Sequence, residues 1–363
     1  MKNIPINVPI FDSSEMKAVE KVISEKYLVD QSFDGGKYVM MFERELRSFV
    51  GAKHAIAVNS GTSALMAALI AAGIGHGDEV IVPSLTFVAT ANAVRAVGAR
   101  PVFADIDEYY TLDPADVRKK INKRVKAVIP VHLYGHTTNM DEIKEIAEEF
   151  GIFVIEDSAQ SLGSIYNGKY TSAIGHMGCI SFYPSKVITT GEGGAIITND
   201  DQLADKLRMI RNHGFDKNGN LSGYGLNLRM QQISAAIGLE QIKKLPDFLK
   251  IRERNAYAYL KELEDVSDKI LLPKIRENSK YNWYLFTVRH PKRENAIRVL
   301  KENGIDARIY YNPPVHRLPA YVSSTSLPFT EMVSNDVLSL PVNPLVSEED
   351  VALISRLLKQ SLN

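Results

Sequence analysis

Between residues 54 and 200, apolar runs of four to six residues alternate with stretches of helical pattern that are ten to fifteen residues long. A buried strand followed by a helix returns the chain to begin a second, parallel strand, so this alternation predicts βαβ units. Seven runs are predicted to be strands, namely Ala55–Asn59, Glu79–Pro83, Pro101–Ala104, Lys126–Val131, Phe153–Glu156, Cys179–Tyr183 and Ala195–Thr198. We therefore predict an α/β fold with a mostly parallel, seven-stranded sheet flanked by helices.

Helices are expected between these strands and before them. Thr62–Ala72 and Met140–Phe150 have helical patterns, and each is followed by a glycine, a common helix stop. Residues 1–50 are predicted to be a separate N-terminal segment. In this segment Asp12 and Glu15 have the spacing of a capping box at the start of a helix.

A second, smaller domain is predicted toward the C-terminus. A helical pattern runs from about Met230 to Leu245, and Pro246 is expected to interrupt it because proline lacks an N–H group. We place the domain boundary there. The prediction is a large domain of residues 1–245 and a small α/β domain of residues 246–363.

Composition narrows the class of protein. Lys and Arg together number 43, as do Asp and Glu, so the charge balance favours neither nucleic acid nor a membrane surface as a partner. No apolar stretch is long enough to span a bilayer and the N-terminus lacks a signal-peptide pattern, so a cytoplasmic location is expected. The single cysteine, Cys179, excludes an internal disulfide and a multi-cysteine zinc site.

Two residues have the pattern of covalent cofactor chemistry. Asp157 follows an apolar run and is expected at the carboxyl end of a strand, where open α/β sheets bind their ligands. Lys186 follows the next predicted strand and precedes a glycine-rich stretch. A partly desolvated amine can form an imine with an aldehyde, and a buried carboxylate can keep a pyridine ring protonated. This pair is typical of pyridoxal 5'-phosphate (PLP), although each residue alone is more often a solvated charge or a turn residue.

Further residues fit the rest of such a cofactor. Gly61, Thr62 and Ser63 join a strand to a helix, and helix N-termini bind phosphate through backbone amides. A role in capping the helix is the alternative for the hydroxyl residues. Phe87 is predicted to stack on one face of the ring, small Ala159 to lie beneath the other, and Gln160 to reach the ring hydroxyl. For Phe87 a place in the hydrophobic core is the alternative, and by composition alone it is the more common one. His132 and His136 are four residues apart but leave a strand instead of sharing a helix face, so no metal site is predicted.

Taken together, the motifs resemble the DegT/DnrJ/EryC/StrS family of sugar aminotransferases, within the aspartate-aminotransferase-like, fold type I superfamily of PLP enzymes. The resemblance covers nearly the whole chain. It is carried by the strings Asn59-Ser-Gly-Thr-Ser-Ala-Leu65, Gly77-Asp-Glu-Val-Ile-Val-Pro83, Thr86-Phe-Val-Ala-Thr90, Glu156-Asp-Ser-Ala-Gln160, Ser181-Phe-Tyr-Pro-Ser-Lys186, Thr190-Gly-Glu-Gly-Gly-Ala195, Arg211-Asn-His-Gly214 and Gly225-Leu-Asn-Leu-Arg-Met230.

The resemblance implies roles for individual residues. Lys186 would hold the cofactor and move the proton, Asp157 would pair with the pyridine nitrogen, and Gln160 would approach the ring oxygen. Ser181 would join Gly61, Thr62 and Ser63 around the phosphate. Asn227 would reach the cofactor of a second subunit, which implies a homodimer with shared active sites. The implied substrate contacts are Arg229, Tyr311 and His316. Many relatives have His-Tyr where this chain has Tyr310-Tyr311, which places the substrate in doubt more than the chemistry.

The implied activity is transfer of an amino group from an amino acid, with L-glutamate expected as donor, to a keto sugar carried by a nucleotide. The expected acceptor is a 4-keto-6-deoxy sugar, and a 3-keto sugar nucleotide is the alternative. A PLP-binding regulatory protein without turnover is a second alternative. Related sugar dehydratases have His at the position of Lys186, and a sulfur-transfer enzyme would need an exposed cysteine, whereas Cys179 lies in an apolar strand pattern.

Overall fold

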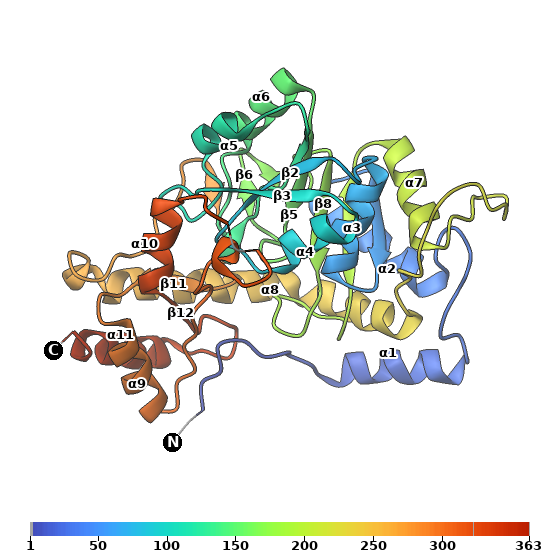
Figure 1. Cartoon of the computed structure of the whole chain (residues 1–363). Helices are drawn as coiled ribbons and strands as arrows, with labels where there is room; N and C mark the ends of the chain where they lie inside the picture. The colour runs from blue at the N-terminus through green and yellow to red at the C-terminus, as the bar shows by residue number, and fades with distance from the viewer. Residues whose placement is uncertain (1–2, 322, 363) are drawn as a thin grey trace.

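The computed structural model describes residues 3–321 and 323–362. Its central feature is a seven-stranded sheet in the order β1-β9-β8-β5-β4-β2-β3 (Figure 1). The strands are β1 (His54–Val58), β2 (Glu79–Pro83), β3 (Arg100–Ala104), β4 (Val125–Val128), β5 (Phe153–Asp157), β8 (Met177–Ser181) and β9 (Gly194–Thr198). Only β9 runs against its neighbours within this sheet. The predicted mostly parallel, seven-stranded sheet is confirmed.

Helices alternate with these strands and precede them along the first two thirds of the chain. They are α1 (Ser13–Ser24), α2 (Lys37–Val50), α3 (Gly61–Ala71), α4 (Ala89–Ala96), α5 (Pro114–Lys120), α6 (Met140–Phe150) and α7 (Asp201–Arg211), with a short 3₁₀ turn η1 (Leu133–Gly135). The capping box predicted from Asp12 and Glu15 is present at the start of α1. Helix α3 is buried over most of its length and packs against β5, β8 and β9, because its Ala and Leu side chains leave no polar face.

The C-terminal part adds a two-stranded sheet and three helices. Strand β11 (Phe286–Arg289) pairs with β12 (Val337–Leu340) in antiparallel register. Around this pair lie α9 (Arg293–Glu302), α10 (Pro328–Asp336), α11 (Glu348–Gln360) and the 3₁₀ turns η2 (Glu264–Val266) and η3 (Val315–Arg317). A further small sheet joins β10 (Ser279–Lys280) to β6 (Ile165–Tyr166) and β7 (Lys169–Tyr170), so the two parts of the chain are also linked by strand pairing.

One helix crosses from one part to the other. Helix α8 (Gln232–Glu262) runs beneath the sheet and continues through Pro246 (Figure 1). The expectation that Pro246 interrupts this helix is therefore wrong. An internal proline costs about 3 kcal/mol, but Leu245 and Phe248 on either side of it are buried in the main hydrophobic cluster, and this packing holds the helix together.

The hydrophobic core has a separate cluster in the C-terminal part. It includes Tyr259, Trp283, Phe286 and Leu340, all buried. Ile4 also belongs to it, because the N-terminal segment forms a bridge from Ile4 to Ile305 before the chain reaches α1 at the other end of the molecule (Figure 1). The C-terminal part of the chain therefore has a hydrophobic cluster of its own, to which the N-terminal segment contributes Ile4.

No helix among residues 3–321 and 323–362 has the length and apolarity needed to cross a lipid bilayer.

Candidate active site

The topology brings three chain segments to one edge of the sheet. Strands β1 and β8 both run against β9, and β8 is parallel to β5, so all three end at the same side. Asp157 is the last residue of β5, Ser181 is the last of β8, and Gly61 begins α3 after β1. The position predicted for Asp157 at the carboxyl end of a strand is confirmed.

Asp157 carries a buried carboxyl group with a hydrogen-bond donor for each oxygen. The Thr90 hydroxyl donates to Oδ2 at 2.8 Å, and the Ala159 amide donates to Oδ1 at 3.2 Å. Burial raises the pKa of this carboxyl, while these hydrogen bonds and the nearby Lys186 ammonium oppose that change. The ionised form of this carboxyl group is therefore stabilised by Thr90, the Ala159 amide and Lys186 against the effect of burial.

Lys186 lies in the loop after β8, with its side chain half-buried. Its backbone amide donates to the Tyr183 carbonyl at 2.9 Å, which fixes the turn. Its Nζ lies 5.0 Å from the centre of the Tyr284 ring, an aromatic face that attracts an ammonium group. The Tyr284 hydroxyl in turn lies 3.2 Å from the Ser185 hydroxyl, so the small domain contributes to this part of the site.

The start of α3, where a phosphate cradle is predicted, lies next to the end of β8. Ser60 is the N-cap, and its side chain accepts a hydrogen bond from the Ser63 amide at 3.1 Å, so capping accounts for this pair. Gly61 lies directly against Ser181, because a Cβ on Gly61 would be 2.7 Å from the Ser181 Cβ. Thr62 follows in the first turn and is partly exposed. Backbone amides at this point are available to an anion.

Aromatic and amide side chains surround the space beside Asp157. The Phe87 ring is 55% exposed, and its centre lies 6.0 Å from that of Tyr311. The Gln160 amide donates to the Tyr311 hydroxyl at 3.2 Å and accepts from the Tyr134 backbone amide at 2.8 Å. Phe87, Gln160 and Tyr311 are therefore brought together with Asp157 from three separate segments of the chain.

Asn227 and Arg229 lie on a different surface. Asn227 is exposed and lines a cavity of about 430 Å³ together with Asn59, Gly191 and Arg229. Its carbonyl accepts a hydrogen bond from the Asn59 side chain at 3.4 Å. The Arg229 guanidinium donates to the Asn212 side chain at 2.8 Å, while its buried Nε has no partner.

His316 is fully buried, away from solvent. Its Nδ1 lies 2.5 Å from the Ser84 hydroxyl and its Nε2 lies 3.0 Å from a Glu331 carboxylate oxygen. Both ring nitrogens are thus engaged within the chain, so His316 ties the C-terminal segment to the loop after β2. A contact with substrate would require one of these bonds to break.

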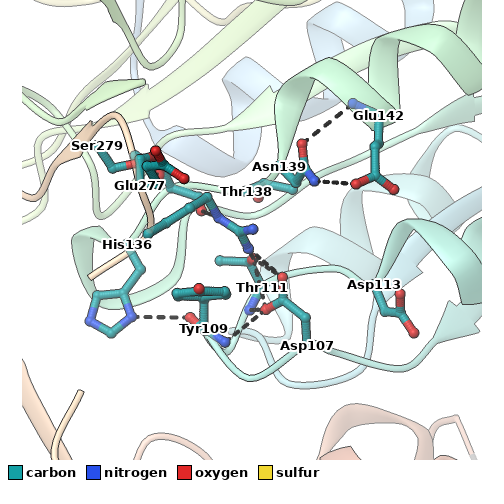
Figure 2. Close-up of polar contacts among 12 residues, drawn as sticks. Asp107, Tyr109, Thr111, Asp113, His136, Thr138, Asn139, Glu142, Glu277 and Ser279 are labelled. Atoms are coloured by element: carbon teal, nitrogen blue, oxygen red, sulfur yellow. Dashed lines mark hydrogen bonds and ion pairs between the residues drawn. The ribbon is translucent and has the colours of Figure 1, made fainter. Parts of the chain in front are cut away.

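His132 and His136 form structural contacts. His132 Nε2 lies 2.9 Å from Glu156, and its Nδ1 accepts from the Thr138 amide. Figure 2 shows His136 with its Nδ1 on the Tyr109 carbonyl at 3.0 Å. Arg276 pairs with Asp107 and thereby joins the segment before β10 to the loop after β3.

Neither a metal centre nor an exposed thiol is found in the part of the chain described. Within residues 3–321 and 323–362 no three His, Cys, Asp or Glu side chains are grouped so that they could hold a metal ion. Cys179 is buried within β8, and burial raises the pKa of its thiol. A buried neutral thiol is a poor nucleophile, which argues against sulfur transfer.

The sequence reasoning did not assign a role to Thr90. This residue lies within the string Thr86-Phe-Val-Ala-Thr90 that carries part of the family resemblance, yet its contact with Asp157 spans 67 residues of sequence. A threonine within a family motif indicates a functional or structural role, but the sequence alone does not show which residue its hydroxyl group binds. Glu156 was missed in the same way: it is fully buried and accepts hydrogen bonds from the amides of Ser172, Ile174 and Gly175.

Comparison with known proteins identifies the family. The sequence model of the DegT/DnrJ/EryC1/StrS aminotransferase family matches residues 10–359. The chain belongs to this family. It is an aminotransferase with the fold type I architecture, and like the aminotransferases of its family it depends on PLP.

Individual relatives align over almost their whole length. GDP-perosamine synthase of Caulobacter vibrioides is 37% identical over 372 residues, which cover 100% of this chain and 99% of the relative. UDP-2-acetamido-2-deoxy-3-oxo-D-glucuronate aminotransferase of Pseudomonas aeruginosa is 39% identical over 322 residues, 88% of this chain and 89% of the relative. The crystal structure of DesV from S. venezuelae superposes with a TM-score of 0.91 at 35% identity and covers 98% of both chains.

The residues at the sheet edge fit this cofactor. The missing Cβ of Gly61 leaves backbone at the start of α3 open to a phosphate, and the Asp157 carboxylate matches a protonated pyridine nitrogen. When bound, PLP supplies an electron sink for removal of a proton from the carbon that carries the amino group.

Replacing Gly61 with Ala should weaken cofactor binding without unfolding the protein. The new Cβ would collide with the Ser181 Cβ and displace the start of α3, where charge-assisted hydrogen bonds to a phosphate would form. Losing one such bond corresponds to about tenfold or more in affinity. PLP titration followed by absorbance measures this change. Gly75→Ala is the matched control, since its Cβ would lie 3.7 Å from the Val97 carbonyl oxygen, an ordinary contact distance. An equal loss in both variants would contradict the proposed cradle.

His136 should make the protein less stable as the pH falls. Burial lowers the pKa of its imidazole from 6.5 to about 4, so the unfolded chain binds a proton more readily than the folded one between these values. Stability is therefore fully present above pH 6.5 and is lost progressively as the pH falls toward 4, by about 2 kcal/mol between pH 7 and 5. Urea unfolding of His136→Phe should show a smaller loss over this range. His76→Phe, at an exposed site, should retain the full loss, and parallel profiles for His136→Phe and the unchanged protein would exclude His136 as the group responsible.

Proposed function

We propose that Lys186 holds PLP covalently and that Asp157 pairs with its pyridine nitrogen. The observation that carries this proposal is the convergence of these two side chains at one edge of the sheet. Asp157 and Cys179 are register partners on the adjacent strands β5 and β8, and Lys186 follows β8 closely enough for its charge to act on Asp157. A cation and a buried carboxylate in this arrangement are what the cofactor requires of the protein.

The remaining contacts follow from the site. Gly61, Thr62, Ser63 and Ser181 hold the phosphate at the start of α3. Phe87 stacks on one face of the ring, Ala159 lies beneath the other, and Gln160 faces the ring oxygen. The exposure of Phe87 and its proximity to Tyr311 support a stacking role, since its ring face is available to a planar ligand.

Lys186 also moves the proton in this proposal. With PLP bound, the Lys186 amine would take the proton from the donor carbon as general base and then, as its conjugate acid, deliver that proton to the cofactor carbon on the other side of the shared nitrogen. L-Glutamate is the proposed donor. Because the keto acid leaves before the keto sugar binds, the two half-reactions give ping-pong kinetics.

The proposed acceptor is a nucleotide-linked 4-keto-6-deoxy sugar. This choice rests on the resemblance of the motifs around Lys186 and Asn227 to those of family members that aminate position 4. A 3-keto sugar nucleotide is the second candidate, supported by the relative from Pseudomonas aeruginosa whose name specifies a 3-oxo sugar. Tyr311 and Arg229 are the proposed substrate contacts, whereas for His316 the engaged ring nitrogens favour a supporting role.

A homodimer with shared active sites completes the proposal. Asn227 is exposed at the mouth of a cavity instead of facing the Asp157 site of its own chain. An exposed asparagine that caps nothing is available to a second subunit. Exposed Tyr224 and Leu221 in the preceding loop add apolar surface that an interface would bury.

Reduction with borohydride should fix the cofactor to Lys186. Peptide mass mapping of the reduced holoprotein is expected to find the added mass on the peptide containing Lys186 and on no other. Lys186→Ala should lose this label and also the absorbance of the lysine-bound cofactor. Lys169→Ala, an exposed lysine elsewhere, serves as control. Label on a different peptide would overturn the proposed site.

Glutamate should then bleach the absorbance of the holoprotein, and the correct keto sugar nucleotide should restore it. A panel of 4-keto and 3-keto sugar nucleotides, read by the mass change of the sugar, decides between the two acceptors. Failure of every amino donor to bleach the protein would contradict the aminotransfer step.

A further inference from the structure

Asp157 is held by a chain of two hydroxyl groups. A carboxylate only accepts hydrogen bonds, so the hydroxyl hydrogen of Thr90 must point to Asp157 Oδ2 at 2.8 Å. The Thr86 and Thr90 hydroxyl oxygens lie 2.9 Å apart. Because the single hydroxyl hydrogen of Thr90 is already used, Thr86 must donate to Thr90. The direction of the chain, from Thr86 through Thr90 to Asp157, is therefore settled by hydrogen-bonding capacity.

This chain is shielded from water. Thr90 is 0% exposed, Thr86 is 2% exposed and Asp157 is 6% exposed. In such surroundings a hydrogen bond to a charge is stronger than in water, and consecutive hydrogen bonds polarise one another. Water cannot easily replace the hydroxyl of Thr90 if it is removed.

The two threonines belong to the turn that presents Phe87. The Thr90 amide donates to the Phe87 carbonyl at 3.1 Å, and Thr90 is the second residue of α4. One turn thus carries both the aromatic ring that faces the cofactor space and the hydroxyl that fixes the carboxylate. The N-terminus of α4 also brings partial positive charge toward Asp157.

We propose that Thr90 is a positioning residue for the cofactor: its hydroxyl keeps the Asp157 carboxylate ionised and aimed at the pyridine nitrogen, and Thr86 supports Thr90. The inference rests on the role proposed for Asp157. According to this inference, the loop after β2 helps to set the protonation of the pyridine ring of PLP, in addition to providing Phe87 to stack on that ring.

The electrostatic surroundings explain why the hydroxyl is needed. Burial raises the pKa of Asp157, and the Thr90 hydrogen bond is the strongest influence that opposes it. Lys186 and His132 also favour the ionised form of the Asp157 carboxyl group. The pKa values of the nearby Tyr311 hydroxyl and Cys179 thiol are themselves raised by burial. Without the hydroxyl, the carboxyl would take up a proton more readily, and a neutral acid cannot balance a protonated pyridine.

The test compares Thr90→Val, which keeps the shape and removes the hydroxyl, with Thr90→Ser, which restores it. Thr287→Val is the matched control, since Thr287 is also fully buried and hydrogen-bonded to a hydroxyl, that of Ser339, in the small domain. For each holoprotein, the absorbance of the lysine-bound cofactor is titrated against pH, and cofactor affinity, kcat and KM are measured.

Thr90→Val should shift the midpoint of this titration in the same direction as Asp157→Asn and weaken cofactor binding by about 10- to 100-fold. It should lower kcat by a similar factor while leaving the KM for the sugar nucleotide within about twofold. Thr90→Ser should recover most of both losses, and Thr86→Val should give a smaller shift in the same direction.

A Thr90→Val protein with an unchanged midpoint and affinity, but with a loss of thermal stability equal to that of Thr287→Val, would overturn the proposal and leave Thr90 a purely structural residue. If Thr90→Val does not fold, the Thr86→Val and Thr90→Ser titrations decide in its place. If Asp157→Asn also leaves the midpoint unchanged, or if Lys186 carries no cofactor, the proposed function itself fails, which is a distinct result.

Discussion

Asp157 carries its carboxylate at the end of a buried strand, where a charge is stable only if its oxygens find hydrogen-bond donors. The donors come from the start of α4 and from the Ala159 amide two residues further on. Around it, Gln160 connects Tyr134 to Tyr311, and Lys186 extends over Tyr284. The start of α4 and the turn at Ala159 are therefore tied to this charged group, since moving either of them would leave a buried carboxylate oxygen without its donor.

The sheet makes this arrangement possible. Strands that share a direction end at one edge, so side chains far apart in sequence meet there without long loops. The single reversed strand, β9, allows β1 to join the sheet in the same direction as β8, which places the start of α3 beside Ser181. Strand direction thus determines which segments meet at the binding site, and the loops after the strands carry the side chains that bind the ligand.

Much of the fold and part of the site could be predicted from the sequence. All seven strands of the main sheet, the capping box at Asp12 and Glu15 and the strand-end position of Asp157 were predicted from local patterns, because burial on both faces and helix capping leave local signals. Contacts between distant segments were not predicted. The partner of Thr90 is 67 residues away in the sequence. Ile4 in the N-terminal segment pairs with Ile305 in the C-terminal part. The two ring nitrogens of His316 bind Ser84 and Glu331, which come from different segments. The helix through Pro246 was misread because tertiary packing outweighed the local cost of proline.

Helix α8 has a mechanical consequence. Its 31 residues form a rod of roughly 46 Å at about 1.5 Å per residue, with one end in the main core and the other in the second cluster. Swinging the small domain away as a rigid lobe would require this rod to bend or its buried residues to lose their packing. We therefore expect a bulky nucleotide sugar to be admitted by local rearrangement of loops and aromatic rings at the rim, with the two lobes held at a nearly constant separation throughout the catalytic cycle.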